Sequence, residues 1–366
     1  MNPLLTDKHM ALCQFENGRA TMNTHRRLIL FGRTILTAGL MCLVAGAGVT
    51  RATTAKPDPY LRPVAVPVPA DNAITPARVE LGKMLFFDPR LSGSQWISCA
   101  SCHNPALSWS DGLPTAIGDG MKKLPRRTPT ILNVAYNTIF MWDGRAASLE
   151  DQATGPIKAK AEMDQDMKIL VERLMAIPGY KAAFERAYPG EGITEKTIAK
   201  ALASFERTIV SADSPFDRWH AGDKNAVDES AKRGFKLFTG KAKCDACHEG
   251  FNFTDDGFHN IGLKTSKGMS EDVGRDAQRK VKVNKGAFKT PTLRDVALTG
   301  PYMHNGMYRT LEEVVDHYDR GGDVKDNLDP NMEPLNLTSQ EKRDLVAFLK
   351  SLTGAPMQMT IPQLPR

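Results

Sequence analysis

Apolar residues recur every three to four positions in several stretches of the chain, and this spacing predicts amphipathic helices. Two of the stretches open with Thr75 and Thr194, which are good helix N-caps, and Pro76 suits a first helical turn. Strands would show strict alternation of apolar and polar residues, and no convincing alternation occurs. The pattern predicts an all-α chain with long loops and with helices over 75–87, 194–211, 228–238, 310–320 and 338–352.

The N-terminal part of the chain has the pattern of an export signal. Three arginines precede an apolar run of 15 residues, Ile35 to Val49, which is short for a membrane span. We therefore expect a leader with a signal peptide over residues 1–52 and a periplasmic protein, with an uncleaved anchor as the less favoured alternative. Met22 is a more natural start, which favours a mis-called start for residues 1–21.

Charge and composition narrow the choice of partners. The 366-residue chain has a net charge of +6, but the leader alone holds six Lys and Arg against two Asp and Glu. The small remaining charge provides no basic surface, so we expect no nucleic-acid partner. Residues 53–75 are rich in Pro, Ala and Thr, which is typical of an extended arm.

Four of the six cysteines form two copies of the pattern Cys-x-x-Cys-His, made by Cys99, Cys102 and His103 and by Cys244, Cys247 and His248. This pattern is typical of c-type haem attachment, in which the thiols form thioethers and the histidine becomes an axial iron ligand. A zinc ribbon would place its pairs about 15–20 residues apart. Here 145 residues separate the first cysteines, and nothing indicates the βαβ surround of a thioredoxin-like site. We expect two covalently bound haems c.

An internal repeat follows each haem motif. Residues 128–151 align without gaps to residues 290–313, at an offset of 162, and Thr-Pro-Thr, Val-Ala, Met, Gly and Leu-Glu coincide. The repeat predicts two related cytochrome c-like domains with one haem each, which we place at 76–222 and 223–366.

The two copies differ at positions near the expected haems, which indicates different roles for them. The differing pairs are Trp142 and His304, Gln152 and Val314, and Pro156 and Tyr318.

Over roughly residues 72–356 the chain resembles the bacterial dihaem cytochrome c peroxidases and the related MauG proteins. The resemblance rests on the motifs "CASCHNP", "SDGLPTAIGD", "RRTPTILNVAYN", "WDGRAASLEDQATGPI", "AEM", "CDACHEG", "FHNIGL" and "TGPYMHNG". It implies that the N-terminal domain is peroxidatic and reduces hydrogen peroxide. The C-terminal domain would pass on electrons, and a calcium ion would lie between the domains.

The resemblance also assigns roles to individual residues. Glu162 resembles the distal carboxylate that moves peroxide protons, and Gln152 resembles the partner of that carboxylate in the pocket. Trp142 resembles the tryptophan that lies between the haems. Thr299 and Pro301 resemble residues whose backbone carbonyls bind calcium.

Three positions depart from the peroxidase pattern. Arg127 stands where the family often has Asn at the calcium site. Asp119 stands 16 residues after His103, where many peroxidases carry a distal His, so haem 1 should be open at rest. Tyr318 stands where the peroxidases usually place a Met ligand to haem 2, and in this the chain resembles MauG. Other residues that could bind the second iron are Met303, Met307, His304 and His259.

The leading hypothesis is a periplasmic dihaem peroxidase that takes electrons from a donor such as a small cytochrome c or a cupredoxin. The first alternative is a MauG-like enzyme that oxidises residues of a partner protein through a high-valent dihaem state. An alternative of another class is a dihaem electron carrier without catalysis, which would have no use for Glu162. Relatives of this kind are often dimers, so the resemblance allows a homodimer.

Overall fold

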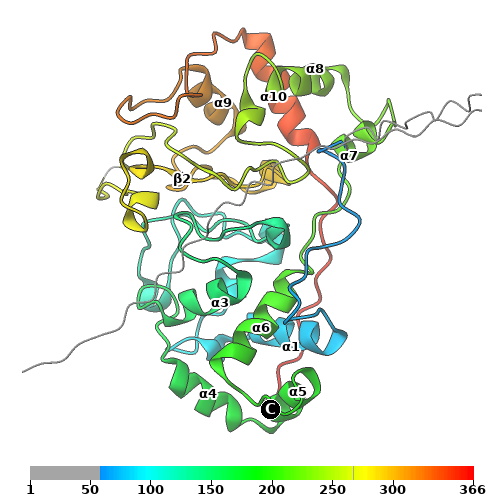
Figure 1. Cartoon of the computed structure of the whole chain (residues 1–366), viewed down its shortest axis with the longest axis vertical. Helices are drawn as coiled ribbons and strands as arrows, with labels where there is room; N and C mark the ends of the chain where they lie inside the picture. Colours follow the sequence, from blue (N-terminus) through cyan, green and yellow to red (C-terminus); the bar gives the residue numbers. More distant parts are fainter. Residues whose placement is uncertain (1–57, 267) are drawn as a thin grey trace, which may run out of the picture. The chain divides into compact units, whose positions relative to one another are not determined.

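The structure, a computed structural model, describes residues 58–366 apart from residue 267, and these residues belong to one compact unit. The predicted leader over 1–52 and the start of the predicted arm lie outside the described residues. Within the described part of the chain, no helix is both long and apolar enough to cross a membrane. Helices dominate the fold (Figure 1): α1 (Pro76–Phe87), α2 (Cys99–Cys102), α3 (Leu149–Lys158), α4 (Met167–Met175), α5 (Pro178–Ala187), α6 (Glu195–Glu206), α7 (Pro215–His220), α8 (Glu229–Phe238), α9 (Leu311–Asp319) and α10 (Ser339–Ser351).

Short 3-10 turns and one strand pair complete the secondary structure. The strands β1 (Phe258–His259) and β2 (Phe288–Lys289) are antiparallel, with Phe258 opposite Lys289. The structure supports the coarser form of the all-α expectation: the protein is mostly helical with a little strand. Strands of two residues are too short to show alternation in a sequence. The turns are η1 (Pro89–Leu91), η2 (Pro105–Leu107), η3 (Asp119–Met121), η4 (Val134–Tyr136), η5 (Cys244–Ala246), η6 (Arg275–Ala277), η7 (Lys282–Asn284) and η8 (Val296–Leu298).

The five helices expected from the apolar spacing are present as α1, α6, α8, α9 and α10. Thr75 caps α1 by accepting a hydrogen bond from the Arg78 N–H at 3.3 Å. Thr194 caps α6, which ends at Glu206, so the predicted extension to residue 211 is wrong. The segment after Glu206 instead turns away and buries Ile209 in the core.

Two hydrophobic cores divide the described residues into what we call the first lobe and the second lobe. The first core draws on α1 and α6, and the second on α8 and α10. Gly82 of α1 packs against the backbone carbonyl of Ala201, and Gly234 of α8 packs in the same way against that of Asp344. The same close contact between helices therefore occurs in both lobes.

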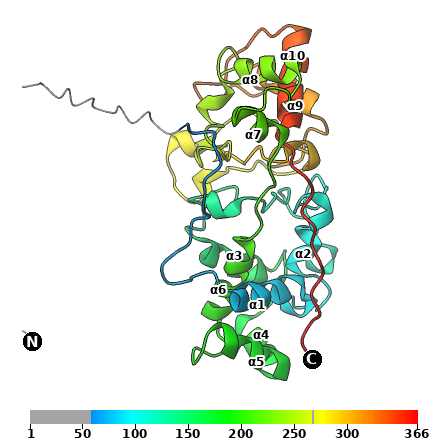
Figure 2. The same cartoon turned by 90° about the vertical axis from the view of Figure 1, so that its right-hand side faces the viewer.

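Each end of the described chain packs on the lobe to which it does not belong in sequence. Tyr60, near the first described residue, packs against the second core. The C-terminal tail runs back to the first lobe, as the red trace in Figure 2 shows, where Met357 and Met359 pack. There the Gly179 N–H donates to the Arg366 carbonyl at 3.2 Å. The lobes are thus tied together by both ends.

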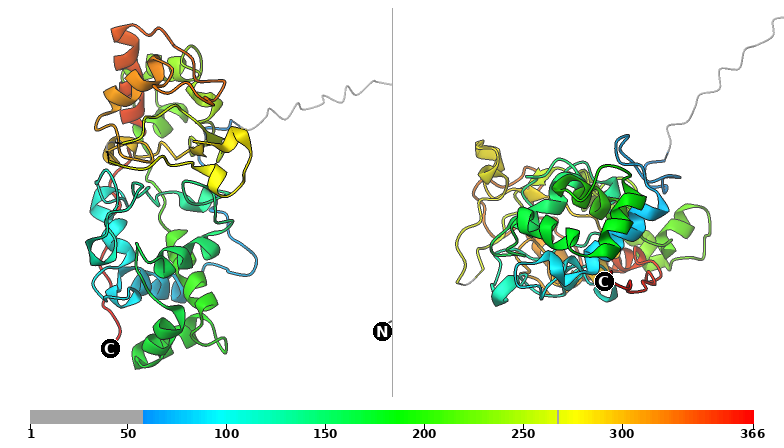
Figure 3. Two further views of the ribbon diagram at one scale, coloured as in Figure 1. Left: turned by 90° about the vertical axis from the view of Figure 1, so that its left-hand side faces the viewer. Right: turned by 90° about the horizontal axis from the view of Figure 1, so that it is seen from below.

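Polar contacts also cross directly between the lobes. Arg126 pairs with Asp143 at 2.8 Å and with Asp272 of the second lobe at 2.7 Å. The Lys289 N–H of β2 donates to the Trp142 carbonyl at 2.8 Å. The strand pair therefore lies where the second lobe meets the first. Figure 3 shows the ribbon of the chain from two further sides.

Candidate functional site

The first Cys-x-x-Cys-His motif forms helix α2, which Ser98 and Ser101 open with a reciprocal capping box. Nδ1 of His103 lies 3.1 Å from the carbonyl oxygen of Trp109. Burial lowers the pKa of His103, which favours the neutral ring. A neutral ring that donates through Nδ1 keeps Nε2 as a free base. Such a backbone contact is the usual way in which a protein orients an iron-binding histidine.

The second motif repeats this arrangement. Cys244 opens the turn η5, and Nδ1 of His248 lies 2.9 Å from the carbonyl oxygen of Phe253. Burial lowers the pKa of His248 to about 4, so its ring is neutral at physiological pH. Cys99, Cys102, Cys244 and Cys247 are all free thiols. Both motifs therefore present two thiols and one oriented, neutral imidazole.

A cavity of about 270 Å³ lies beside the second motif. His248, Cys244 and Cys247 line it, together with Tyr318 of α9 and Trp142 of the first lobe. The lining is mostly apolar, which is typical of a haem pocket that excludes water. The residues present thus fit a covalently attached haem.

Glu162 lies on the loop that follows α3, and its side chain is half-buried. Burial raises the pKa of Glu162. Nη2 of Arg145 lies 4.0 Å from Oε1 of Glu162, and its positive charge offsets part of this rise. Burial raises the pKa of the Cys102 thiol to about 11, and the charges of Asp111 and then Glu162 add to the shift. The carboxylate therefore lies near enough to the first haem motif for its charge to influence the Cys102 thiol.

Asp119 holds the Glu162 loop in place. Its carboxylate accepts hydrogen bonds from the Ser94 N–H at 3.1 Å and the Gly120 N–H at 3.0 Å. Its own N–H donates to the Glu162 carbonyl at 2.6 Å. These bonds, led by the one to Ser94, lower the pKa of Asp119, so the carboxylate stays ionised and engaged. Asp119 thus stabilises the loop through contacts with Ser94 and Glu162. The sequence did not predict this role because these partners are distant from Asp119 in the chain.

Gln152 lies on α3, and its side-chain Nε2 lies 3.8 Å from the sulfur of Met141. Among the described residues, its hydrogen bond goes to Met141 and not to Glu162. The structure therefore places Gln152 on the helix that precedes the Glu162 loop, with no hydrogen bond between the two side chains among the described residues. Arg145 is the side chain that reaches Glu162, and the motif "WDGR" contains it.

Trp142 lies at the contact between the lobes. Its indole N–H donates to the Arg127 carbonyl at 2.9 Å, and its ring meets His304 edge-on, with ring centres 6.4 Å apart. His304 in turn stacks on Phe288 of β2, with centres 3.5 Å apart. The two residues at equivalent positions of the repeat, Trp142 and His304, are thus in contact.

Tyr318 faces the second cavity, whereas its neighbour His317 points elsewhere. Burial raises the pKa of Tyr318, and the nearby thiols of Cys244 and Cys247 raise it further. Nε2 of His317 lies 2.8 Å from the Ile261 carbonyl, so that ring is already engaged. Among the described residues, the cavity lining includes the rival ligands Met303 and His304 but not Met307.

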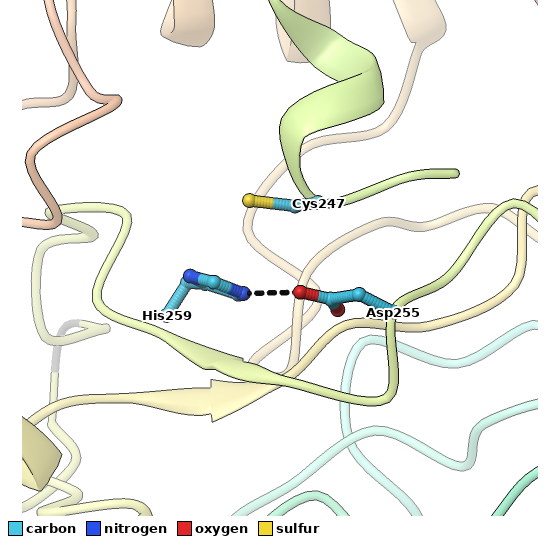
Figure 4. Close-up of side chains that lie close together, drawn as sticks. All are labelled: Cys247, Asp255 and His259. Atoms are coloured by element: carbon cyan, nitrogen blue, oxygen red, sulfur yellow. Dashed lines mark hydrogen bonds and ion pairs between the residues drawn. The ribbon is translucent and has the colours of Figure 1, made fainter. Parts of the chain in front are cut away.

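His259 also lines this cavity, and Figure 4 shows it beside Cys247 and Asp255. Its two ring nitrogens lie 2.9 Å from Asp255 and 2.7 Å from Asp329. The hydrogen bond to Asp255, with smaller contributions that include Asp329, raises the pKa of His259 to about 11. A doubly protonated ring has no lone pair for iron, so His259 is a poor rival to Tyr318. Because Cys247 belongs to a haem motif, its sulfur would be a thioether and not a thiolate ligand for another metal.

The expected calcium site does not fit a calcium ion. The Thr299 carbonyl, one of the two expected ligands, accepts a hydrogen bond from the Arg127 guanidinium. Pro301 is buried two residues further on. A second cation beside a buried guanidinium would be strongly repelled.

Comparison with known proteins agrees with this geometry. Residues 76–225 match the family described as di-haem cytochrome c peroxidase, and residues 231–353 match cytochrome c. The chain is 52% identical over 307 residues to the methylamine utilization protein MauG of Methylorubrum extorquens, covering 84% of this chain and 86% of that protein. It is 39% identical over 359 residues to the cytochrome-c peroxidase IdrP1 of Denitromonas iodatirespirans, covering 89% and 96%.

A solved structure shares the fold as well. The crystal structure of a MauG-like protein associated with microbial copper homeostasis superposes with a TM-score of 0.74 at 33% identity, over 81% of this chain and 94% of that one. The chain belongs to the di-haem cytochrome c peroxidase and MauG family, whose members are oxidoreductases. It is 52% and 45% identical to two relatives named MauG, and 39% and 38% identical to two named cytochrome-c peroxidase IdrP1. Membership implies haem c as the cofactor.

Proposed function

We propose that this protein is a periplasmic dihaem peroxidase that reduces hydrogen peroxide to water at the first haem motif. Cys99 and Cys102 would hold one haem with His103 as axial ligand, and Cys244 and Cys247 would hold the other with His248. The bound haems supply redox-active iron that binds peroxide and exchanges single electrons. Two electrons and two protons convert one peroxide to two waters, and the electrons come from a donor protein such as a small cytochrome c or a cupredoxin.

Glu162 moves the protons of this reaction. Its ionised carboxylate would take a proton from one oxygen of hydrogen peroxide and deliver it to the other oxygen, which would leave as water. The observation that carries the proposal is a half-buried carboxylate, held in position by the Asp119 loop, beside the first haem motif. An electron carrier without catalysis, the alternative of another class, needs no such group.

Trp142 and His304 lie where electrons would cross between the lobes. Both rings line the second cavity and contact each other, and the Trp142 indole N–H donates a hydrogen bond to the Arg127 carbonyl. Packing and electron relay are compatible roles for this buried tryptophan.

A second function is favoured by Tyr318 and by the 52% identity to MauG. In this alternative the electrons come from residues of a partner protein, which is the substrate. A phenolate ligand favours oxidised iron, whereas a thioether ligand raises the potential. Tyr318 as ligand would therefore suit an enzyme that keeps oxidising equivalents on both haems.

One experiment separates these functions. The oxidised holoprotein is mixed with hydrogen peroxide and a reduced small cytochrome c, and the oxidation of the cytochrome is followed optically. A peroxidase oxidises two cytochromes for each peroxide. Peroxide consumption without cytochrome oxidation would instead support the partner-protein alternative, and no consumption at all would contradict both.

A further inference from the structure

Arg127 lies buried at the contact between the two lobes. Its backbone N–H donates to the carbonyl of His304 at 2.8 Å, and its carbonyl accepts the indole N–H of Trp142 at 2.9 Å. Its guanidinium donates to Ser110 Oγ of the first lobe at 3.3 Å and to the Thr299 carbonyl of the second lobe. One residue thus binds both lobes through its backbone and its side chain.

The charge of this guanidinium is not paired with a carboxylate. Among the described residues, its hydrogen-bond acceptors are a hydroxyl and a carbonyl, and its Nε has no partner. Burial lowers the pKa of Arg127 to about 10, with Asp111 acting in the opposite direction. The side chain therefore remains a cation at physiological pH, in a place of low dielectric.

A buried cation whose acceptors are neutral oxygens resembles a metal ion in its site. Backbone carbonyls and hydroxyls are among the oxygen ligands that calcium uses. Arginine has five donors and no acceptor, so it cannot itself bind a metal ion. An asparagine at position 127 would offer a carbonyl oxygen instead, which is an acceptable calcium ligand.

We propose that the Arg127 guanidinium takes the place of a calcium ion as the fixed cation between the lobes, and that the protein neither binds nor needs calcium there. The guanidinium fixes Thr299, and the backbone of the same residue fixes Trp142 and His304. The cation at the contact between the lobes is therefore a side chain of the protein, and a chelator cannot remove it. The proposal does not depend on the peroxide chemistry, because its test measures binding and stability.

The first test is a calorimetric titration of the holoprotein with calcium chloride after treatment with EGTA. The expected result is no saturable binding, with the haem spectrum and the thermal midpoint unchanged by EGTA. Binding of one calcium ion per chain, with a spectrum that changes on chelation and recovers with calcium, would overturn the proposal. This measurement needs no variant, so it stands even if a substitution prevents folding.

The second test uses Arg127→Asn, which removes the cation and offers a carbonyl oxygen. In EGTA its thermal midpoint should fall by several degrees, and calcium should restore part of the loss. Arg127→Lys keeps the charge and should show no response to calcium. The matched control is Arg126→Asn, because Arg126 also crosses between the lobes but pairs with the carboxylates Asp143 and Asp272. If Arg127→Asn is as stable as the parent and its thermal midpoint does not change with calcium, the guanidinium does not act as the fixed cation between the lobes.

Discussion

Asp119 stabilises the loop that carries Glu162, at a position where the resemblance implies an iron ligand. The resemblance to the dihaem peroxidases implies a distal histidine at this position, and its absence from the sequence predicts an open first site. The structure adds that the carboxylate is engaged by the Ser94 and Gly120 N–H groups while its backbone holds Glu162. Sequence reasoning could identify the missing ligand, but contacts between loops distant in the chain leave no local pattern.

Glu162→Gln keeps the shape of the side chain and removes the base. The rate of the reaction with peroxide should fall by roughly 10²–10⁴, the usual cost of losing a positioned acid–base group. Glu172, an exposed glutamate of α4, provides the control Glu172→Gln, which should react at the parent rate. Stopped-flow mixing with peroxide measures both variants, and parent-like kinetics in Glu162→Gln would refute the assignment.

The pH profile of the same reaction should depend on Glu162. A base works only when it is deprotonated, and burial raises the pKa of this carboxyl above that of an exposed glutamate. The parent rate should therefore fall as the pH is lowered through the raised pKa, and the fall should begin at a higher pH than an exposed glutamate would give. Glu162→Gln should lose this limb of the profile. A limb that persists in the variant belongs to another group.

We expect Tyr318 to set the reduction potential and the spectrum of the second haem. If its phenolate oxygen binds iron, Tyr318→Met should raise the potential of the second haem, since a thioether favours reduced iron. Tyr318→Phe should leave that haem open or let Met303 bind. Tyr302→Phe, at another tyrosine of the same cavity, is the control and should leave the spectrum unchanged. An unchanged low-spin signal in Tyr318→Phe would show that another residue holds the iron.

At the scale of elements, the apolar spacing predicted α1, α6, α8, α9 and α10, whereas α3, α4, α5 and α7 were not predicted. Of the missed helices, α7 has six residues and α3 contains Pro156, which breaks the usual helical signal. The strand pair has two residues per strand, so its existence depends on contacts between loops and not on local preference. Helix positions were thus predictable in part, and loop structure was not.

The contact between α1 and α6 depends on a glycine. Gly82→Ala would push a methyl group into the Ala201 carbonyl, and overpacking of this kind costs about 1–3 kcal/mol. Gly155→Ala on α3 is the matched control, because the added methyl would lie 3.8 Å from Met141, an ordinary contact distance. Thermal unfolding of the two holoproteins should show a lower midpoint for Gly82→Ala alone. Equal midpoints would mean that the helices separate at little cost.

At the scale of the whole molecule, the internal repeat predicted two related units, and each lobe has the same helix contact around Gly82 or Gly234. The repeat could not predict that Tyr60 packs on the second lobe or that the C-terminal tail packs on the first. Such contacts pair residues hundreds of positions apart and leave no periodic signal. The two Cys-x-x-Cys-His motifs, in contrast, were predictable because the two cysteines and the histidine lie within five consecutive positions.

The central claim is that the first haem is open to peroxide at rest while the second is held by Tyr318. Optical and EPR spectra of the fully oxidised holoprotein, taken before and after one equivalent of peroxide, test this claim most directly. We predict one high-spin haem at rest and an immediate spectral change with peroxide, without prior reduction, because Asp119 is engaged by Ser94 and Gly120 and no histidine stands at its position. A purely low-spin resting spectrum that ignores peroxide until one electron is added would contradict the account.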